Sequence, residues 1–95
     1  MKERAIVDAD TVPRWGRGVR LRFDKARQVW ILMAPERVLM PDGVALDIMK
    51  RIDGERTVAA VVDELAEEYL AEEDEMSREV VAFLQDLTDR GLVAI

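Results

Sequence analysis

The chain has 95 residues, of which 49% are hydrophobic and 36% are charged, which is typical of one globular domain near the lower size limit for independent folding. It contains neither cysteine nor histidine, which excludes disulfides, thiol chemistry and the commonest metal ligand, and which argues against an enzyme. The net charge of −6 is uneven, because residues 1–37 hold nine basic and five acidic side chains whereas the other 58 residues hold five basic and fifteen acidic ones.

The first eighteen residues are predicted to form an extended and partly mobile arm. Pro13, Gly16 and Gly18 interrupt any regular pattern in this segment. Residues 19–95 are expected to form a single folded domain.

Three strands are predicted next, at about residues 19–23, 28–33 and 37–40. Apolar and basic side chains alternate over the first, whereas the second is apolar at nearly every position, which is typical of a central strand. The third is short and lies between Pro35 and Pro41. Because proline donates no ladder hydrogen bond, this third strand is predicted to lie at an edge of the sheet.

The turn between the first two strands is predicted to be the three-residue loop Lys25-Ala26-Arg27. That loop pairs Phe23 with Val29 and gathers the apolar side chains of both strands on one face. This predicted apolar face comprises Val19, Leu21, Phe23, Val29, Ile31 and Met33. It also brings Arg22 beside Trp30 on the other face, where a cation–π contact is expected. A two-residue loop would mix the two faces.

Three helices are predicted after the sheet, over residues 43–53, 58–70 and 75–90, because apolar residues recur there with helical spacing. The expected N-caps are Asp42, Thr57 and Asp74. Gly54 is the expected stop of the first helix. The predicted fold class is α+β, with a small three-stranded antiparallel sheet followed by three helices, similar to a winged helix-turn-helix.

A winged-helix nucleic-acid-binding protein is a less favoured alternative for such a fold. A helix that approaches phosphates should be basic, but the predicted third helix and its N-cap Asp74 together carry five acids against Arg78 and Arg90. The acidic run at 67–75 lacks the spacing of a calcium loop and is expected to be a solvated face, so no metal or cofactor is predicted. No apolar run reaches the length of a membrane span and no secretory signal is recognisable, so we expect a cytoplasmic protein with no membrane partner.

Two longer stretches of sequence point to a family. PERVLMPDGVALDIMKRIDGERTVAAVVDELAEEY and VVAFLQDLTDRGLV, with Trp30 in the preceding strand, resemble the pyrroloquinoline quinone (PQQ) biosynthesis protein D family over about residues 14–93. The sequence departs from the family pattern at Pro41-Asp42, where Leu-Asn is frequent, and at Glu79, where Asp is common. The first change keeps a capping residue and the second keeps the charge.

The resemblance implies a non-catalytic peptide chaperone. Members of the family bind a ribosomally made precursor peptide and present it to a radical S-adenosylmethionine (SAM) enzyme, and related recognition domains hold a leader peptide as an added strand beside the third helix. The backbone of the third predicted strand would then pair with the peptide, and one flank of the third helix would line the groove. The residues so implied are Arg37, Val38, Leu39, Met40, Ser77, Val81, Leu84, Gln85 and Thr88. The alternative for Val81 and Leu84 is a place in the core.

Three interpretations stay open at this point. Arg20, Arg22 and Trp30 are expected to form a patch that contacts either the partner enzyme or the N-terminal arm. The peptide could belong to another modified-peptide pathway instead of PQQ biosynthesis. The exposed edge allows a monomer or a homodimer.

Overall fold

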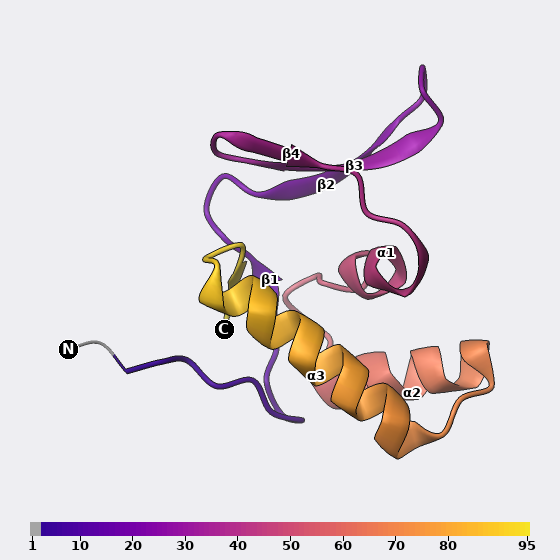
Figure 1. The fold of residues 1–95 in the computed structure, drawn as a ribbon. Coiled ribbons are helices and arrows are strands. Elements are labelled where there is room, and N and C mark those ends of the chain that lie inside the picture. Colours follow the sequence, from indigo (N-terminus) through magenta and orange to yellow (C-terminus); the bar gives the residue numbers. More distant parts are fainter. Residues whose placement is uncertain (1–2) are drawn as a thin grey trace.

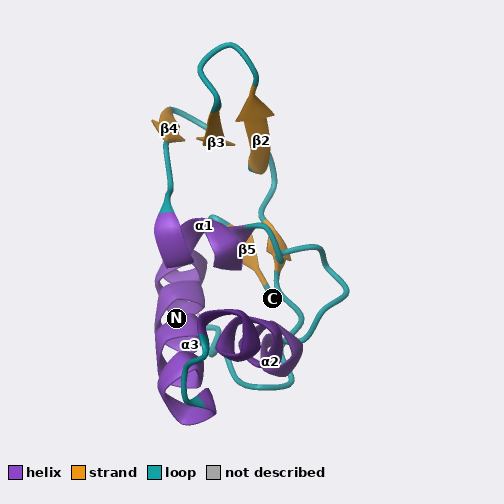
Figure 2. Ribbon diagram, turned by 90° about the vertical axis from the view of Figure 1, so that its right-hand side faces the viewer, coloured by secondary structure: helices purple, strands orange, loops and turns teal. Residues whose placement is uncertain are grey.

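A computed structural model describes residues 3–95, and its helices lie on one side of a small sheet (Figures 1 and 2). The elements are β1 (Arg14–Trp15), β2 (Arg20–Asp24), β3 (Val29–Ala34), β4 (Arg37–Leu39), α1 (Gly43–Met49), α2 (Val58–Tyr69), α3 (Glu73–Asp89) and β5 (Val93–Ala94). The main sheet is antiparallel with the order β2-β3-β4, so β3 is central and β4 is an edge, as predicted. The α+β class with three helices after three strands is confirmed.

The segment before residue 19 is more ordered than predicted. β1 pairs with β5 in a second antiparallel sheet that joins the two ends of the chain. Val7 is only 4% exposed and belongs to the hydrophobic core, and Pro13 is also fully buried. The folded body therefore begins well before residue 19. Strands of two residues leave no periodic pattern, which is why the sequence did not reveal them.

The predicted register of the first hairpin is wrong by one residue. Asp24 pairs with Val29, so the loop has four residues, 25–28. The carboxylate of Asp24 accepts hydrogen bonds from two backbone N–H groups of this loop, at 3.0 and 3.2 Å. Gln28 closes the loop in the left-handed region with φ 59°. Local hydrogen bonds accepted by the Asp24 carboxylate thus stabilise a longer turn than the one expected.

The one-residue shift redistributes the side chains between the two faces of the main sheet. The face toward the helices carries Leu21, Phe23, Trp30, Leu32 and Leu39, and the other carries Arg20, Arg22, Val29, Ile31, Met33 and Val38. The predicted contact between Arg22 and Trp30 is therefore wrong. The cation above the Trp30 ring is Lys50 of the segment after α1, with its Nζ 4.8 Å from the ring centroid.

Only part of the predicted capping is observed. Thr57 caps α2, because its Oγ1 accepts a hydrogen bond of 3.1 Å from the backbone N–H of Ala60. Asp42 occupies the N-cap position of α1 but its side chain makes no capping hydrogen bond. α3 starts two residues earlier than predicted, with Glu72 and not Asp74 at its N-cap. α1 ends at Met49, several residues before the expected stop.

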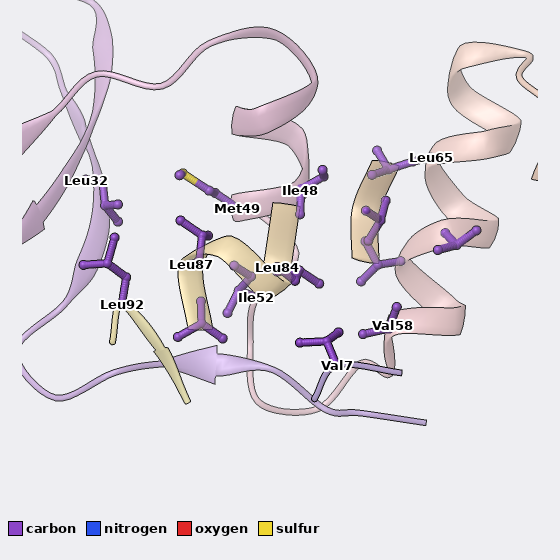
Figure 3. Close-up of a cluster of buried hydrophobic side chains, with 14 of the residues drawn as sticks. Val7, Leu32, Ile48, Met49, Ile52, Val58, Leu65, Leu84, Leu87 and Leu92 are labelled. Carbon is purple, nitrogen blue, oxygen red and sulfur yellow. The ribbon is translucent and has the colours of Figure 1, made fainter. Parts of the chain in front are cut away.

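The core lies between the sheet and the three helices (Figure 3). Leu32 is fully buried and points from β3 toward Leu92 and Met49, while Leu84 and Leu65 fill the contact between α3 and α2. No helix within residues 3–95 is long and apolar enough to cross a membrane. The same residues contain no group of acidic side chains placed to hold a metal ion.

Candidate functional site

The unpaired edge of β4 is the most exposed apolar feature of the main sheet. Three consecutive large apolar side chains lie there, with Val38 61%, Leu39 41% and Met40 64% exposed. One side of β4 pairs with β3, and within residues 3–95 no strand pairs with its other side. Folded proteins usually protect such an edge with charge or cover it, so an apolar open edge indicates a place for another strand.

Successive residues of β4 point to opposite faces of the sheet. Leu39 lies opposite Leu32 and therefore points toward the helices, whereas Val38 lies opposite Met33 and points away from them. Arg37 lies opposite Ala34 at the start of the strand and is exposed. An added strand would thus find apolar neighbours on both faces.

Three of the five side chains predicted on α3, Val81, Leu84 and Thr88, are used within the folded body, and Val81 packs half-buried against the core. Leu84 is fully buried among the core residues, so it supports the helix packing and has no free surface for a ligand. Thr88 donates a hydrogen bond of 2.7 Å from its Oγ1 to the carbonyl oxygen of Leu84 and is half-buried.

Gln85 binds the N-terminal arm. Its Oε1 accepts a hydrogen bond of 2.9 Å from the backbone N–H of Val7, and its Nε2 donates one of 2.8 Å to the carbonyl oxygen of Ala5. The side-chain amide therefore contacts the arm as a neighbouring strand would, with one donor and one acceptor.

An ion pair holds the start of the arm against the same helix. Arg4 donates two hydrogen bonds to Asp89, from Nε at 3.0 Å and from Nη2 at 2.6 Å. This hydrogen bonding keeps the pKa of the Asp89 carboxyl below its ordinary value. Because the ionised carboxylate is the form that binds Arg4, the contact is complete above the ordinary pKa of aspartate and is lost as the pH falls through the lowered one.

The predicted peptide-binding residues thus divide into two groups, because residues 37–40 lie along the open edge of the main sheet and the α3 residues do not. Ser77, Val81 and Gln85 lie against the arm and, together with Arg4, Ile6, Val7, Arg78 and Ala82, line a hollow of about 500 Å³. Figure 1 shows this arm on the lower side of α3, whereas β4 lies above the helix. The structure therefore does not bring Ser77, Val81 and Gln85 to the edge of β4.

Phe83 is a candidate that the sequence reasoning did not single out. It is half-buried and packs against the core. Successive helical residues are 100° apart, so Phe83 lies about 200° around α3 from Gln85 and faces away from the arm. In the sequence, Phe83 is one of the apolar positions of the predicted third helix, which indicated core packing alone. The two flanks of α3 can be distinguished only in the structure, where the arm lies against one of them.

The expected partner patch is also divided. Arg20 and Arg22 project from the face of the sheet that points away from the helices, and both are exposed. Trp30 points to the other face, where its ring lies 5.5 Å from the ring of Phe23 in an edge-on arrangement and under the Lys50 ammonium group. Trp30 therefore belongs to the packing between the sheet and α1, and not to the arginine face.

Comparison with known proteins agrees with this architecture. Residues 30–93 match the family described as Coenzyme PQQ synthesis protein D (PqqD). The PqqA binding protein of Rhodopseudomonas palustris strain TIE-1 is 48% identical over 90 residues, which cover 95% of this chain and 88% of the relative. The PqqA binding protein of Gluconobacter oxydans is 35% identical over 88 residues, which cover 93% of this chain and 92% of the relative.

Two solved structures share the fold. The solution structure of the PqqD truncation of Methylobacterium extorquens PqqCD, described as a functional and stand-alone RiPP recognition element, has a TM-score of 0.76 and 33% identity, with 97% of each chain covered. The crystal structure of PqqD from Xanthomonas campestris has a TM-score of 0.59 and 35% identity, with 94% of this chain and 99% of that chain covered. Sequence and fold together show that the chain belongs to the PqqD family.

Proposed function

We propose that this protein binds the PqqA precursor peptide without catalysing a reaction on it, and that it presents the peptide to a radical SAM enzyme in the cytoplasm. The names of its relatives and the described role of the structure from Methylobacterium extorquens support peptide binding. The observation that carries the proposal is the open apolar edge of β4. No bound cofactor is needed for this role.

The peptide lies beside β4 as a fourth strand of the main sheet. Backbone N–H and C=O groups along the open side of β4 provide hydrogen bonds that do not depend on the peptide sequence. Specificity then comes from side chains, because alternate peptide residues meet Leu39 on the inner face and Val38 on the outer face.

The wall of this groove is the flank of α3 that faces away from the arm. The opposite flank is occupied by residues 4–7 through Gln85 and Asp89. Phe83 lies on the free flank and offers a half-buried aromatic surface to an apolar peptide side chain. The site so proposed consists of the β4 edge and Phe83, and it replaces Ser77, Val81 and Gln85 as groove residues.

Leu39→Ser tests the edge of β4 directly. We expect the affinity of synthetic PqqA peptide, measured by isothermal titration calorimetry, to fall by about tenfold, because loss of a desolvated apolar contact costs on the order of 1–2 kcal/mol. Leu39 is partly exposed, so the melting temperature should change little.

Leu70→Ser is the matched control. Leu70 is 92% exposed and lies at the turn between α2 and α3, away from β4 (Figure 1). Its replacement should leave the peptide affinity unchanged. Equal affinities of the wild-type protein, Leu39→Ser and Leu70→Ser would contradict binding at the β4 edge.

A further inference from the structure

The face of the main sheet that points away from the helices combines apolar and basic side chains in rows across the strands. Arg20, Met33 and Val38 are neighbours in one row, and Arg22 and Ile31 are neighbours in the next. Cross-strand neighbours of this kind point to the same side of a sheet. We call these five residues the outer face.

The apolar part of the outer face is not covered within residues 3–95. Ile31 and Met33 are only half-buried, and neither belongs to the hydrophobic core or to the side chains packed against it. Val38 is largely exposed. Both ribbon views show the helices on the opposite side of the sheet (Figures 1 and 2). The outer face is therefore an apolar strip open to solvent.

The charges of the outer face are also unsatisfied. Arg20 and Arg22 are exposed, and neither makes an ion pair with a carboxylate of residues 3–95. Two arginines of the helical body are paired instead, since Arg51 lies 3.0 Å from Glu64 and Arg56 lies 3.1 Å from the same carboxylate. In a chain with a net charge of −6, these two guanidinium groups give the outer face a local positive charge beside its apolar side chains.

We infer that the outer face is the docking surface for the radical SAM enzyme, and that the enzyme contributes an acidic surface with an apolar ridge. The ridge packs on Ile31 and Met33, and the carboxylates pair with Arg20 and Arg22. The inference rests on the proposed function, since it locates the partner that the function requires. It differs from the patch expected from the sequence, because Trp30 lies on the other face and takes no part.

The outer face also allows the enzyme to distinguish the peptide-bound protein from the free protein. Val38 belongs to both the outer face and the β4 edge. A peptide strand beside β4 places its own side chain next to Val38 and extends the row that begins at Arg20. The enzyme then contacts chaperone and peptide on one continuous surface, so it binds the peptide-loaded protein more tightly than the free protein.

Arg22→Glu tests this docking surface. Association of the purified radical SAM enzyme of the pathway with the full-length protein is measured by biolayer interferometry, with and without PqqA peptide. We expect Arg22→Glu to weaken association by about tenfold at low salt, and we expect the loss to shrink as salt is raised to about 0.5 M, because screening weakens exposed charge pairs. Met33→Gln, which replaces an apolar side chain by a polar one of similar length, should also weaken association.

Arg78→Glu is the matched control, because Arg78 is also exposed and makes no ion pair within residues 3–95, but lies on α3 beside the arm. It changes the net charge equally and should leave enzyme association unchanged. Equal weakening by Arg22→Glu and Arg78→Glu would show a net-charge effect and would overturn the docking surface, as would a wild-type protein that fails to bind the enzyme.

Calorimetry with PqqA peptide on the same samples separates the two proposals. All three variants should retain the wild-type peptide affinity within about twofold, and an unchanged melting curve of Met33→Gln shows that this variant stays folded. Peptide binding without an effect of Arg22→Glu on the enzyme would overturn the docking surface and leave the proposed function standing. Absence of peptide binding by the wild-type protein would overturn the proposed function itself.

Discussion

The contacts of Gln85 make the two flanks of α3 different. Its amide binds the backbone of Ala5 and Val7, and this contact places the arm on one flank of α3. The other flank carries Phe83, which is half-buried and packs against the core. The spacing of Gln85 on the helix could be predicted from the sequence, but its partner could not, because the arm lies 78 residues away in the chain.

Gln85→Ala should release the arm. Loss of two hydrogen bonds to a partly buried backbone is expected to lower the free energy of unfolding by about 1 kcal/mol and to speed hydrogen exchange at the Val7 amide. Ile6→Ala is the control, because Ile6 is mostly exposed and should have little effect on either quantity. Unchanged exchange at Val7 in Gln85→Ala would contradict the role assigned to this amide.

Two roles of single side chains on the helices could be predicted from the sequence. Thr57 caps α2 as expected, because a capping side chain needs only the next few residues. The place of Leu84 in the core was one of two alternatives, and its complete burial decides between them.

At the scale of elements, the two hairpins of the main sheet depend on residues with positive φ that are not glycine. Gln28 ends the first loop with φ 59°, and Glu36 lies in the second with φ 63°. The first hairpin was predicted with a loop that is one residue too short, since no glycine marked the left-handed position. The order of strands and the edge position of β4 were predictable, because two prolines bracket that strand.

Glu36→Gly should stabilise the hairpin of β3 and β4. A residue other than glycine in the left-handed region costs about 1 kcal/mol, and Glu36 is exposed. We expect a gain of about 0.5–1 kcal/mol in the free energy of unfolding, measured by urea denaturation.

Glu36→Ala provides the comparison for this hairpin. Alanine keeps the steric cost of the positive φ, so this variant should gain nothing. A stability of Glu36→Gly no higher than that of Glu36→Ala would show that the turn is not strained.

At the scale of the whole molecule, a small sheet is attached by one face to an acidic helical body and exposes its other face and the edge of β4. Leu32 joins the sheet to the core, while Arg20 and Arg22 project on the opposite side. The charge difference between the two parts of the chain was visible in the sequence. Which side chains share a face was not, because a shift of one residue in a hairpin exchanges the faces.

The pairing of the two chain ends likewise escaped the sequence reasoning. β1 and β5 have two residues each and lie at opposite ends of the chain. Elements so short are defined by their partner and not by their own periodicity. The family resemblance, by contrast, covered most of the chain, since it depends on the order of many short motifs.

The most direct test of the account is a titration of isotope-labelled protein with unlabelled PqqA peptide, followed by nuclear magnetic resonance. The account predicts that amide shifts and intermolecular contacts gather along residues 37–40 and around Phe83, while the amides of Ala5 and Val7 stay unchanged because the arm keeps its place. Shifts at Ala5, Val7 and Gln85, with residues 37–40 unaffected, would show that the peptide binds the other flank of α3 and would contradict strand addition at β4.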